Sequence, residues 1–121
     1  MELVLGTVQF GLPYGIAGRS TLMADDDVRN ILSLAWERGI RQLDTAAAYG
    51  NIEERLWRLC GTRDFEVISK IPSLGHAGHG QDRRRALLAH AQTSVNRLGE
   101  RLKALLFHDA HDLDGIEAPD L

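Results

Sequence analysis

Four side chains that could transfer protons follow three short apolar segments of the sequence. Asp44 comes directly after the apolar segment 40–43, and Tyr49 follows it across a tight turn. Lys70 closes the next apolar segment, and His108 closes the one after that. Since the carboxyl ends of parallel strands meet at one edge of a sheet, we expect these four side chains to lie close together there.

These four residue types suit the protonation of a carbonyl oxygen. An ammonium group beside a phenol stabilises the phenolate, so Lys70 would make Tyr49 a better proton donor near neutral pH. The carboxylate of Asp44 would keep that ammonium charged and oriented, and His108 could orient the substrate or relay a proton. Because no amino acid carries a hydride for the carbonyl carbon, a nicotinamide cofactor is implied.

The elements that must position these residues alternate along the chain. Apolar runs predict strands at 3–5, 40–43, 65–70 and 102–107, and helical spacing predicts helices at 25–38, 51–60 and 82–98. Glycine and proline predict loops at 6–20 and 72–80, and the polar tail from 109 could begin a further helix. Alternation of this kind predicts parallel strands joined by right-handed crossovers.

Charge and apolar spacing give each expected helix a start and a buried face. Acidic residues open the first two helices, and Asn51 is a predicted N-cap of the second. Arg83, Arg84 and Arg85 are interpreted as a solvated face of the third helix rather than a phosphate site. The predicted inward residues are Val28, Ile31, Leu32 and Ala35, then Ile52, Leu56, Leu59 and Cys60, then Leu87, Leu88, Ala91, Val95 and Leu98.

Composition limits the classes of protein to consider. The chain has 121 residues, 44% of them hydrophobic, and a formal net charge of -3. This suits one small domain with an ordinary core, or part of a larger domain, over residues 1–121. Nothing basic enough for nucleic acid is present, and no apolar run approaches the ~20 residues of a membrane helix. One cysteine, Cys60, is interpreted as a core residue, and the lack of a signal peptide at the start predicts a cytoplasmic protein.

Four separated blocks of the sequence resemble the aldo-keto reductases, in the order that this family has. The resemblance runs from about residue 3 to residue 112. The blocks are Leu5-Gly6-Thr7-Val8-Gln9-Phe10-Gly11, then Gly39-Ile40-Arg41 with Asp44-Thr45-Ala46 and Tyr49-Gly50, then Ile68-Ser69-Lys70, and finally Leu105-Leu106-Phe107-His108.

The resemblance implies a fold, a reaction and a set of site residues. The fold is α/β, with parallel (β/α) repeats forming the N-terminal half of a TIM (β/α)8 barrel. The reaction is NADP(H)-dependent reduction of an aldehyde or ketone, as in bacterial reductases of the sugar or envelope-polysaccharide type. The implied catalytic residues are Asp44, Tyr49, Lys70 and His108, with Tyr49 as the proton donor. The implied cofactor contacts are Gly6, Thr7 and Asp44, with no metal.

The sequence departs from the family in two places. Ile52 stands before Glu53, where the family has a small polar residue, which should affect the start of a helix more than the chemistry. A full barrel also needs about 250 residues. We therefore expect a fragment, a truncated product, or a half-barrel that associates with a second copy through open sheet edges.

Two other functions remain open at this stage. A non-catalytic half-barrel or binding domain would keep the fold without the cofactor. A metal-dependent barrel hydrolase would use imidazoles and carboxylates as ligands. The candidate ligands for that hydrolase are His76, His79, His90, His108, Asp109, His111 and Asp112.

Overall fold

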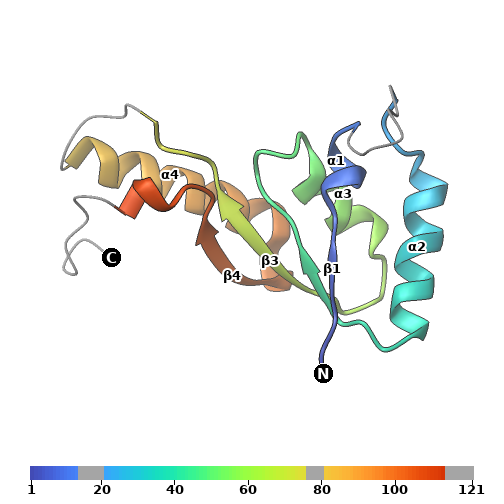
Figure 1. The fold of residues 1–121 in the computed structure, drawn as a ribbon. Helices are drawn as coiled ribbons and strands as arrows, with labels where there is room; N and C mark the ends of the chain where they lie inside the picture. The colour runs from blue at the N-terminus through green and yellow to red at the C-terminus, as the bar shows by residue number, and fades with distance from the viewer. Residues whose placement is uncertain (14–20, 76–80, 114–121) are drawn as a thin grey trace.

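Four parallel strands form the sheet of this protein, in the spatial order β1-β2-β3-β4. The computed structural model describes residues 1–13, 21–75 and 81–113. The strands are β1 (Val4–Gly6), β2 (Gln42–Asp44), β3 (Glu66–Ile71) and β4 (Leu102–Phe107) (Figure 1). Since every neighbouring pair is parallel, the predicted alternation of strands and crossover helices is confirmed.

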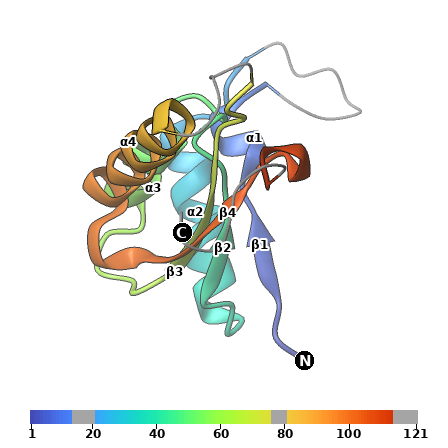
Figure 2. The ribbon, with the colours of Figure 1, turned by 90° about the vertical axis from the view of Figure 1, so that its left-hand side faces the viewer.

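Three long helices connect the strands and lie together on one face of the sheet. They are α2 (Asp25–Glu37), α3 (Ile52–Leu59) and α4 (Gln81–Leu98), and Figure 2 shows them on the same side. A short helix α1 (Val8–Gly11) follows β1, and two 3-10 turns, η1 (Gly99–Arg101) and η2 (Ala110–Leu113), flank β4. This arrangement is one half of the wall of a TIM-type barrel.

The main core fills the space between the sheet and these helices. Leu43 and Val67 point into it from the strands, and Phe65 packs edge-on against Trp36 of α2 with ring centroids 5.1 Å apart. Cys60 is fully buried in this core, as predicted, and its burial raises the pKa of the thiol to about 11. A second cluster of Ile71, Leu74 and Leu87 packs beneath α4.

The segment after β1 differs from the predicted loop. Residues 8–11 form helix α1, closed by hydrogen bonds from the Phe10 amide to the Thr7 carbonyl and from the Leu12 amide to the Val8 carbonyl. Phe10 is 3% exposed and packs in the main core. This tertiary contact stabilises a helical turn, although the glycines of the segment favoured a loop. Residues 14–20 of the predicted loop lie outside the described residues.

Helix α4 turns a different face to the core than we predicted. Leu87 and Leu98 are buried, but Leu88 and Val95 are 57% and 44% exposed. The inward position between the two buried leucines belongs to Ser94, which is fully buried. The reason is chemical, because the Ser94 hydroxyl donates a hydrogen bond to a buried carboxylate, and apolar spacing carries no signal for such a contact.

Three smaller predictions concern the ends of elements. Asn51 occupies the N-cap position of α3 but its side chain makes no capping hydrogen bond. Arg83 is not part of a solvated face, because it pairs with the buried carboxylate of Asp112 at 3.0 Å. Beyond Asp109 the chain forms the 3-10 turn η2, and residues 114–121 lie outside the described part of the chain.

Within residues 1–13, 21–75 and 81–113, no helix is long and apolar enough to cross a bilayer.

Candidate active site

Strand register brings the predicted site residues to one edge of the sheet. Gly6 pairs with Asp44, and Asp44 pairs with Ile68, so these three residues form one row across the sheet. Lys70 lies two positions further along β3 and pairs with Leu106. Because side chains alternate across a strand, Asp44, Ile68 and Lys70 point to the same face, opposite the helices.

Asp44 and Lys70 form an ion pair on this face. The Lys70 Nζ donates to Asp44 Oδ1 and, at 2.9 Å, to the carbonyl oxygen of Thr45. Two acceptors thus hold the ammonium of Lys70. The lysine side chain is still 20% exposed, so it remains accessible from the open face. This is the pairing that the sequence predicted for a charged, oriented lysine.

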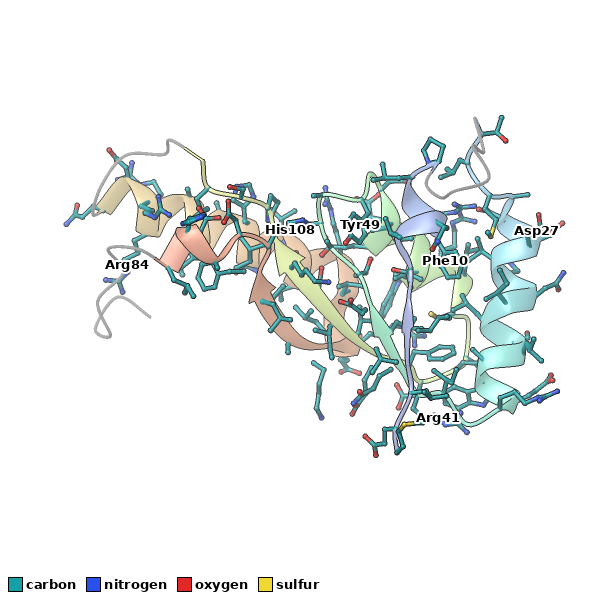
Figure 3. All side chains as sticks on the ribbon, in the orientation of Figure 1. Phe10, Asp27, Arg41, Tyr49, Arg84 and His108 are labelled. Carbon is teal, nitrogen blue, oxygen red and sulfur yellow. The ribbon has the colours of Figure 1, made fainter. Side chains whose placement is uncertain are left out.

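Tyr49 and His108 form a second pair at the same edge. Their ring centroids are 6.1 Å apart and the ring planes meet at 83°, an edge-to-face arrangement. In Figure 3 both side chains lie at the upper end of the sheet, while Arg41 marks the opposite end. The structure therefore gathers all four predicted residues at one edge, joined by contacts into two pairs.

Backbone hydrogen bonds beyond the strands lock the segments that carry these side chains. The Ala47 amide donates to the Lys70 carbonyl at 3.1 Å, and the His108 amide donates to the Ile71 carbonyl at 3.2 Å. The Tyr49 amide closes its own turn on the Ala46 carbonyl at 3.0 Å. These bonds hold the backbone segments that carry the four side chains in place relative to one another.

Gly6 and Thr7, the predicted cofactor contacts, occupy different surroundings. A Cβ built on Gly6 would meet no atom within 4 Å, so the space beside Asp44 is open there. Thr7 is 1% exposed, and both its amide and its hydroxyl donate to the Asp44 carbonyl at 3.0 Å. In this structure the Thr7 hydroxyl holds the end of β2, and its contact with a cofactor stays a prediction.

The close approach of Gly11 to Tyr49 and the buried Arg55 went unnoticed in the sequence. Gly11 lies so close to the tyrosine that a Cβ there would come within 2.0 Å of the Tyr49 carbonyl oxygen. Arg55 is buried on α3 and donates to the Phe10 carbonyl, with a second contact to Asp25 at 2.7 Å. Arg55 thus ties α1 and α2 to α3, and its only signal in the sequence was an arginine on an otherwise apolar helix face.

A buried carboxylate on α3 is the third feature that the sequence did not reveal. Glu53 is one of the acidic residues in the first turn of the helix, and it is 1% exposed. It accepts hydrogen bonds from Ser69 on β3 and Ser94 on α4, at 2.6 and 2.7 Å. Two serines at core positions of a strand and a helix were the available signal.

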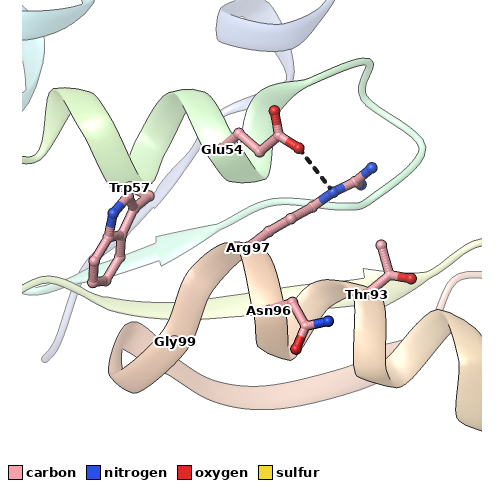
Figure 4. Close-up of a pocket in the computed structure, with 6 residues that line it drawn as sticks. All are labelled: Glu54, Trp57, Thr93, Asn96, Arg97 and Gly99. Atoms are coloured by element: carbon pink, nitrogen blue, oxygen red, sulfur yellow. Dashed lines mark ion pairs between the residues drawn. The ribbon is translucent and has the colours of Figure 1, made fainter.

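Two hollows on the described surface are lined by residues other than the four predicted ones. One lies between α3 and α4 on the outside of the helices, around Trp57 and Arg97 (Figure 4). The other lies at the opposite end of the sheet from His108, beside Arg41 and Glu66. There the hydrogen bond from Gln42 and the ion pair with Lys103 hold the pKa of Glu66 below its ordinary value.

The metal-site alternative gains no support from the described residues. No group of three or more histidine, cysteine, aspartate or glutamate side chains within them is placed to hold a metal ion. Asp112 has another task, since it accepts from the Leu74 amide and pairs with Arg83, both at 3.0 Å. His76 and His79 lie outside the described residues.

The fold and the strand-end residues define a half-barrel of the kind that enzymes with TIM-type folds use. Comparison with protein families matches residues 2–117 to the Aldo/keto reductase family, so the chain belongs to that family. Members typically use NAD(P)H and act on carbonyl compounds. A comparison with curated proteins finds no match.

Solved structures of bacterial aldo-keto reductases are similar to this chain. Two structures of a provisionally assigned aldo-keto reductase from Pseudomonas aeruginosa are 33% and 30% identical, with TM-scores of 0.68 and 0.71. Each match covers 97% of this chain, and 48% and 47% of the respective relative. An aldo/keto reductase from Brucella melitensis, 23% identical over 91% of this chain and 39% of its own, shares the fold with a TM-score of 0.55. The chain thus spans about half the length of the Pseudomonas relatives.

Proposed function

We propose that this chain carries the proton-transfer half of an NADP(H)-dependent reductase that converts an aldehyde or ketone into an alcohol. The observation that carries the proposal is the Asp44–Lys70 ion pair at the strand ends, on the edge that also holds Tyr49 and His108. Family membership supports the same reaction class. The substrate is a small carbonyl compound that reaches the open face of the sheet.

Each of the four residues has one role in this reaction. Tyr49 donates the proton from its hydroxyl to the carbonyl oxygen of the substrate as that oxygen gains negative charge. Lys70 stabilises the phenolate that is left behind, and Asp44 keeps the ammonium in place. His108, edge-on to the Tyr49 ring, donates a hydrogen bond to the substrate oxygen and so orients the carbonyl.

We infer that the nicotinamide cofactor binds beside Gly6. No atom lies within 4 Å of a Cβ at this glycine, and the next residue across the sheet is Asp44, so backbone and carboxylate are both accessible there. When bound, the cofactor supplies the hydride that the carbonyl carbon needs. Gly6 and Asp44 are the described residues that would contact it, with Thr7 supporting Asp44 from behind.

A binding titration followed by a turnover assay tests the proposal. The purified chain is titrated with NADPH, and NADPH oxidation is then followed with and without a panel of small aldehydes and ketones. We expect saturable binding in both the parent chain and Tyr49→Phe, with carbonyl-dependent oxidation only in the parent. Equal oxidation by the two proteins would overturn the role of Tyr49.

A non-catalytic half-barrel is the second candidate function. It is favoured by the extent of the match, since the chain covers only 48% and 47% of its two Pseudomonas relatives. In that case the four site residues are present without turnover. The same titration separates the two functions, because a non-catalytic unit shows no saturable NADPH binding.

A further inference from the structure

Glu53 is a carboxylate that the fold keeps almost completely buried. It is 1% exposed and lies in the first turn of α3, at the junction with β3 and α4. Its Oε1 accepts from the hydroxyls of Ser69 at 2.6 Å and Ser94 at 2.7 Å, and its Oε2 lies 3.4 Å from Arg97. Since burying a charge is costly even when it is paired, a plain apolar contact would have stabilised this junction at lower cost.

Arg97 forms ion pairs with both Glu53 and Glu54. Its Nε lies 3.3 Å from Glu54 on the outer surface of α3, and Figure 4 shows the arginine crossing from α4 toward that residue. The two serine hydroxyls are therefore the short contacts that define where the Glu53 carboxylate lies. Ser69 and Ser94 are both fully buried.

The contacts of Glu53 connect the two segments that carry the proposed proton donor and its lysine. Ser69 is the residue before Lys70 on β3, and Glu53 begins the helix that follows the Tyr49 turn. Because side chains alternate across a strand, the Ser69 hydroxyl points to the helices while Lys70 points to the open face. A bond that anchors Ser69 therefore fixes the pleat from which Lys70 projects.

We propose that Glu53 is a positioning residue, which acts through Ser69 to hold Lys70 in line with Tyr49. The hydrogen bond between Ser69 and Glu53 connects the end of β3 to the start of α3. The distance between Lys70 and Tyr49 depends on that hydrogen bond. The role of Lys70 and Tyr49 in proton transfer rests on the proposed function. The effect of the Ser69–Glu53 hydrogen bond on Lys70 can be measured without turnover.

Ser69 and Ser94 provide a matched pair of variants. Each hydroxyl donates to the same oxygen of Glu53, at nearly the same distance, from a fully buried position. Ser69 is next to Lys70, whereas Ser94 lies on α4, which carries none of the four proposed site residues. If Glu53 served only packing and stability, Ser69→Ala and Ser94→Ala would have the same consequences.

The first measurement follows Lys70 directly by NMR. The chain has two lysines, so Lys103→Arg assigns the side-chain signal of Lys70. We expect Ser69→Ala to shift this signal more than Ser94→Ala does. We also expect Ser69→Ala to increase the exchange rate of the Ala47 amide, which donates to the Lys70 carbonyl, about tenfold more than Ser94→Ala does. Exchange of amides in α2 reports any general loss of stability and is used to correct both variants.

Equal effects of the two variants on Lys70 and Ala47 would overturn the proposal. Glu53→Gln is a conservative variant, because its amide oxygen can still accept a hydrogen bond from Ser69. Glu53→Gln should therefore shift the Lys70 signal less than Ser69→Ala does. A Glu53→Gln signal displaced further than that of Ser69→Ala would also contradict the positioning role. The serine variants keep this test available if a Glu53→Ala chain does not fold.

Turnover separates this proposal from the proposed function. With activity present, Ser69→Ala should lower kcat for carbonyl-dependent NADPH oxidation about tenfold more than Ser94→Ala, with the Kd for NADPH unchanged. A displaced Lys70 signal without any turnover in the parent chain would reject the reductase function and keep the positioning role. Normal turnover with an undisplaced Lys70 signal in Ser69→Ala would reject the positioning role alone.

Discussion

Gly11 and Tyr49 meet backbone to backbone at the upper edge of the sheet. A Cβ on residue 11 would lie 2.0 Å from the Tyr49 carbonyl oxygen and 3.0 Å from the Cβ of Ile52. The contact is reciprocal, since a Cβ on Gly50 would lie 2.9 Å from the Gly11 carbonyl oxygen. The short helix α1 and the tyrosine turn can approach this closely because both positions lack a side chain.

Gly11→Ala should therefore push α1 and the Tyr49 turn apart. A forced contact of this kind costs about 1–3 kcal/mol of unfolding free energy, to be measured by urea denaturation. Gly6→Ala is the matched control, because its added methyl group meets no atom within 4 Å and should leave stability nearly unchanged. Equal midpoints for the two variants would show that the Gly11 contact places no constraint on Tyr49.

The two lysines of the chain allow a test of where the chemistry lies. Lys70 pairs with Asp44 at the upper edge, and Lys103 pairs with Glu66 at 3.1 Å at the other end of the sheet. Both pairs are partly exposed, so Lys70→Met and Lys103→Met should each change stability by about 1 kcal/mol or less. Only Lys70→Met should abolish carbonyl-dependent NADPH oxidation, and loss of oxidation in both variants would contradict the assigned site.

The buried thiol of Cys60 makes stability depend on alkaline pH. Burial raises its pKa to about 11 from an ordinary value of 9.0, so the folded chain keeps a proton that the unfolded chain loses between these values. The contribution of Cys60 to the free energy of unfolding is therefore complete below pH 9.0 and falls as pH rises to about 11. The free energy of unfolding then decreases by at most about 1.4 kcal/mol per pH unit.

Urea unfolding of the parent chain and of Cys60→Ala at several pH values measures this slope. Since other groups also titrate above pH 9, the difference between the two proteins isolates the thiol. Parallel stability curves would show that Cys60 ionises equally in both states. The same burial predicts that a thiol reagent modifies Cys60 only in denaturant.

Open edges and an open face predict self-association of the chain. Among the described strands, β1 and β4 each have one neighbour, and Leu106 on the open face is 46% exposed. We expect light scattering to report a mass above that of one chain, and Leu106→Lys to reduce it. Leu34→Lys is the control, because Leu34 is 53% exposed on α2 and should be neutral. A monomer for the parent chain would contradict this prediction.

Much of the fold could be predicted because each element carries a local signal. Helix α2 begins where three aspartates complement its dipole, and Gly39, with φ of 84°, terminates it. The apolar residues predicted to face inward on α2 and α3 pack in or against the main core, because apolar spacing follows helix geometry. In α4 the same rule fails at Leu88 and Val95, because the buried position between Leu87 and Leu98 belongs to Ser94, which donates a hydrogen bond to Glu53.

The sequence by itself determined which residues stand at the strand ends, and so named Asp44, Tyr49, Lys70 and His108. It could not show that they meet as an Asp44–Lys70 ion pair and a Tyr49–His108 ring contact, because parallel register is set between strands far apart in the chain. The tertiary structure alone decided that Glu53 is buried between Ser69 and Ser94. A charged side chain at a helix start is normally solvated, and only partners from other elements can hold it inside.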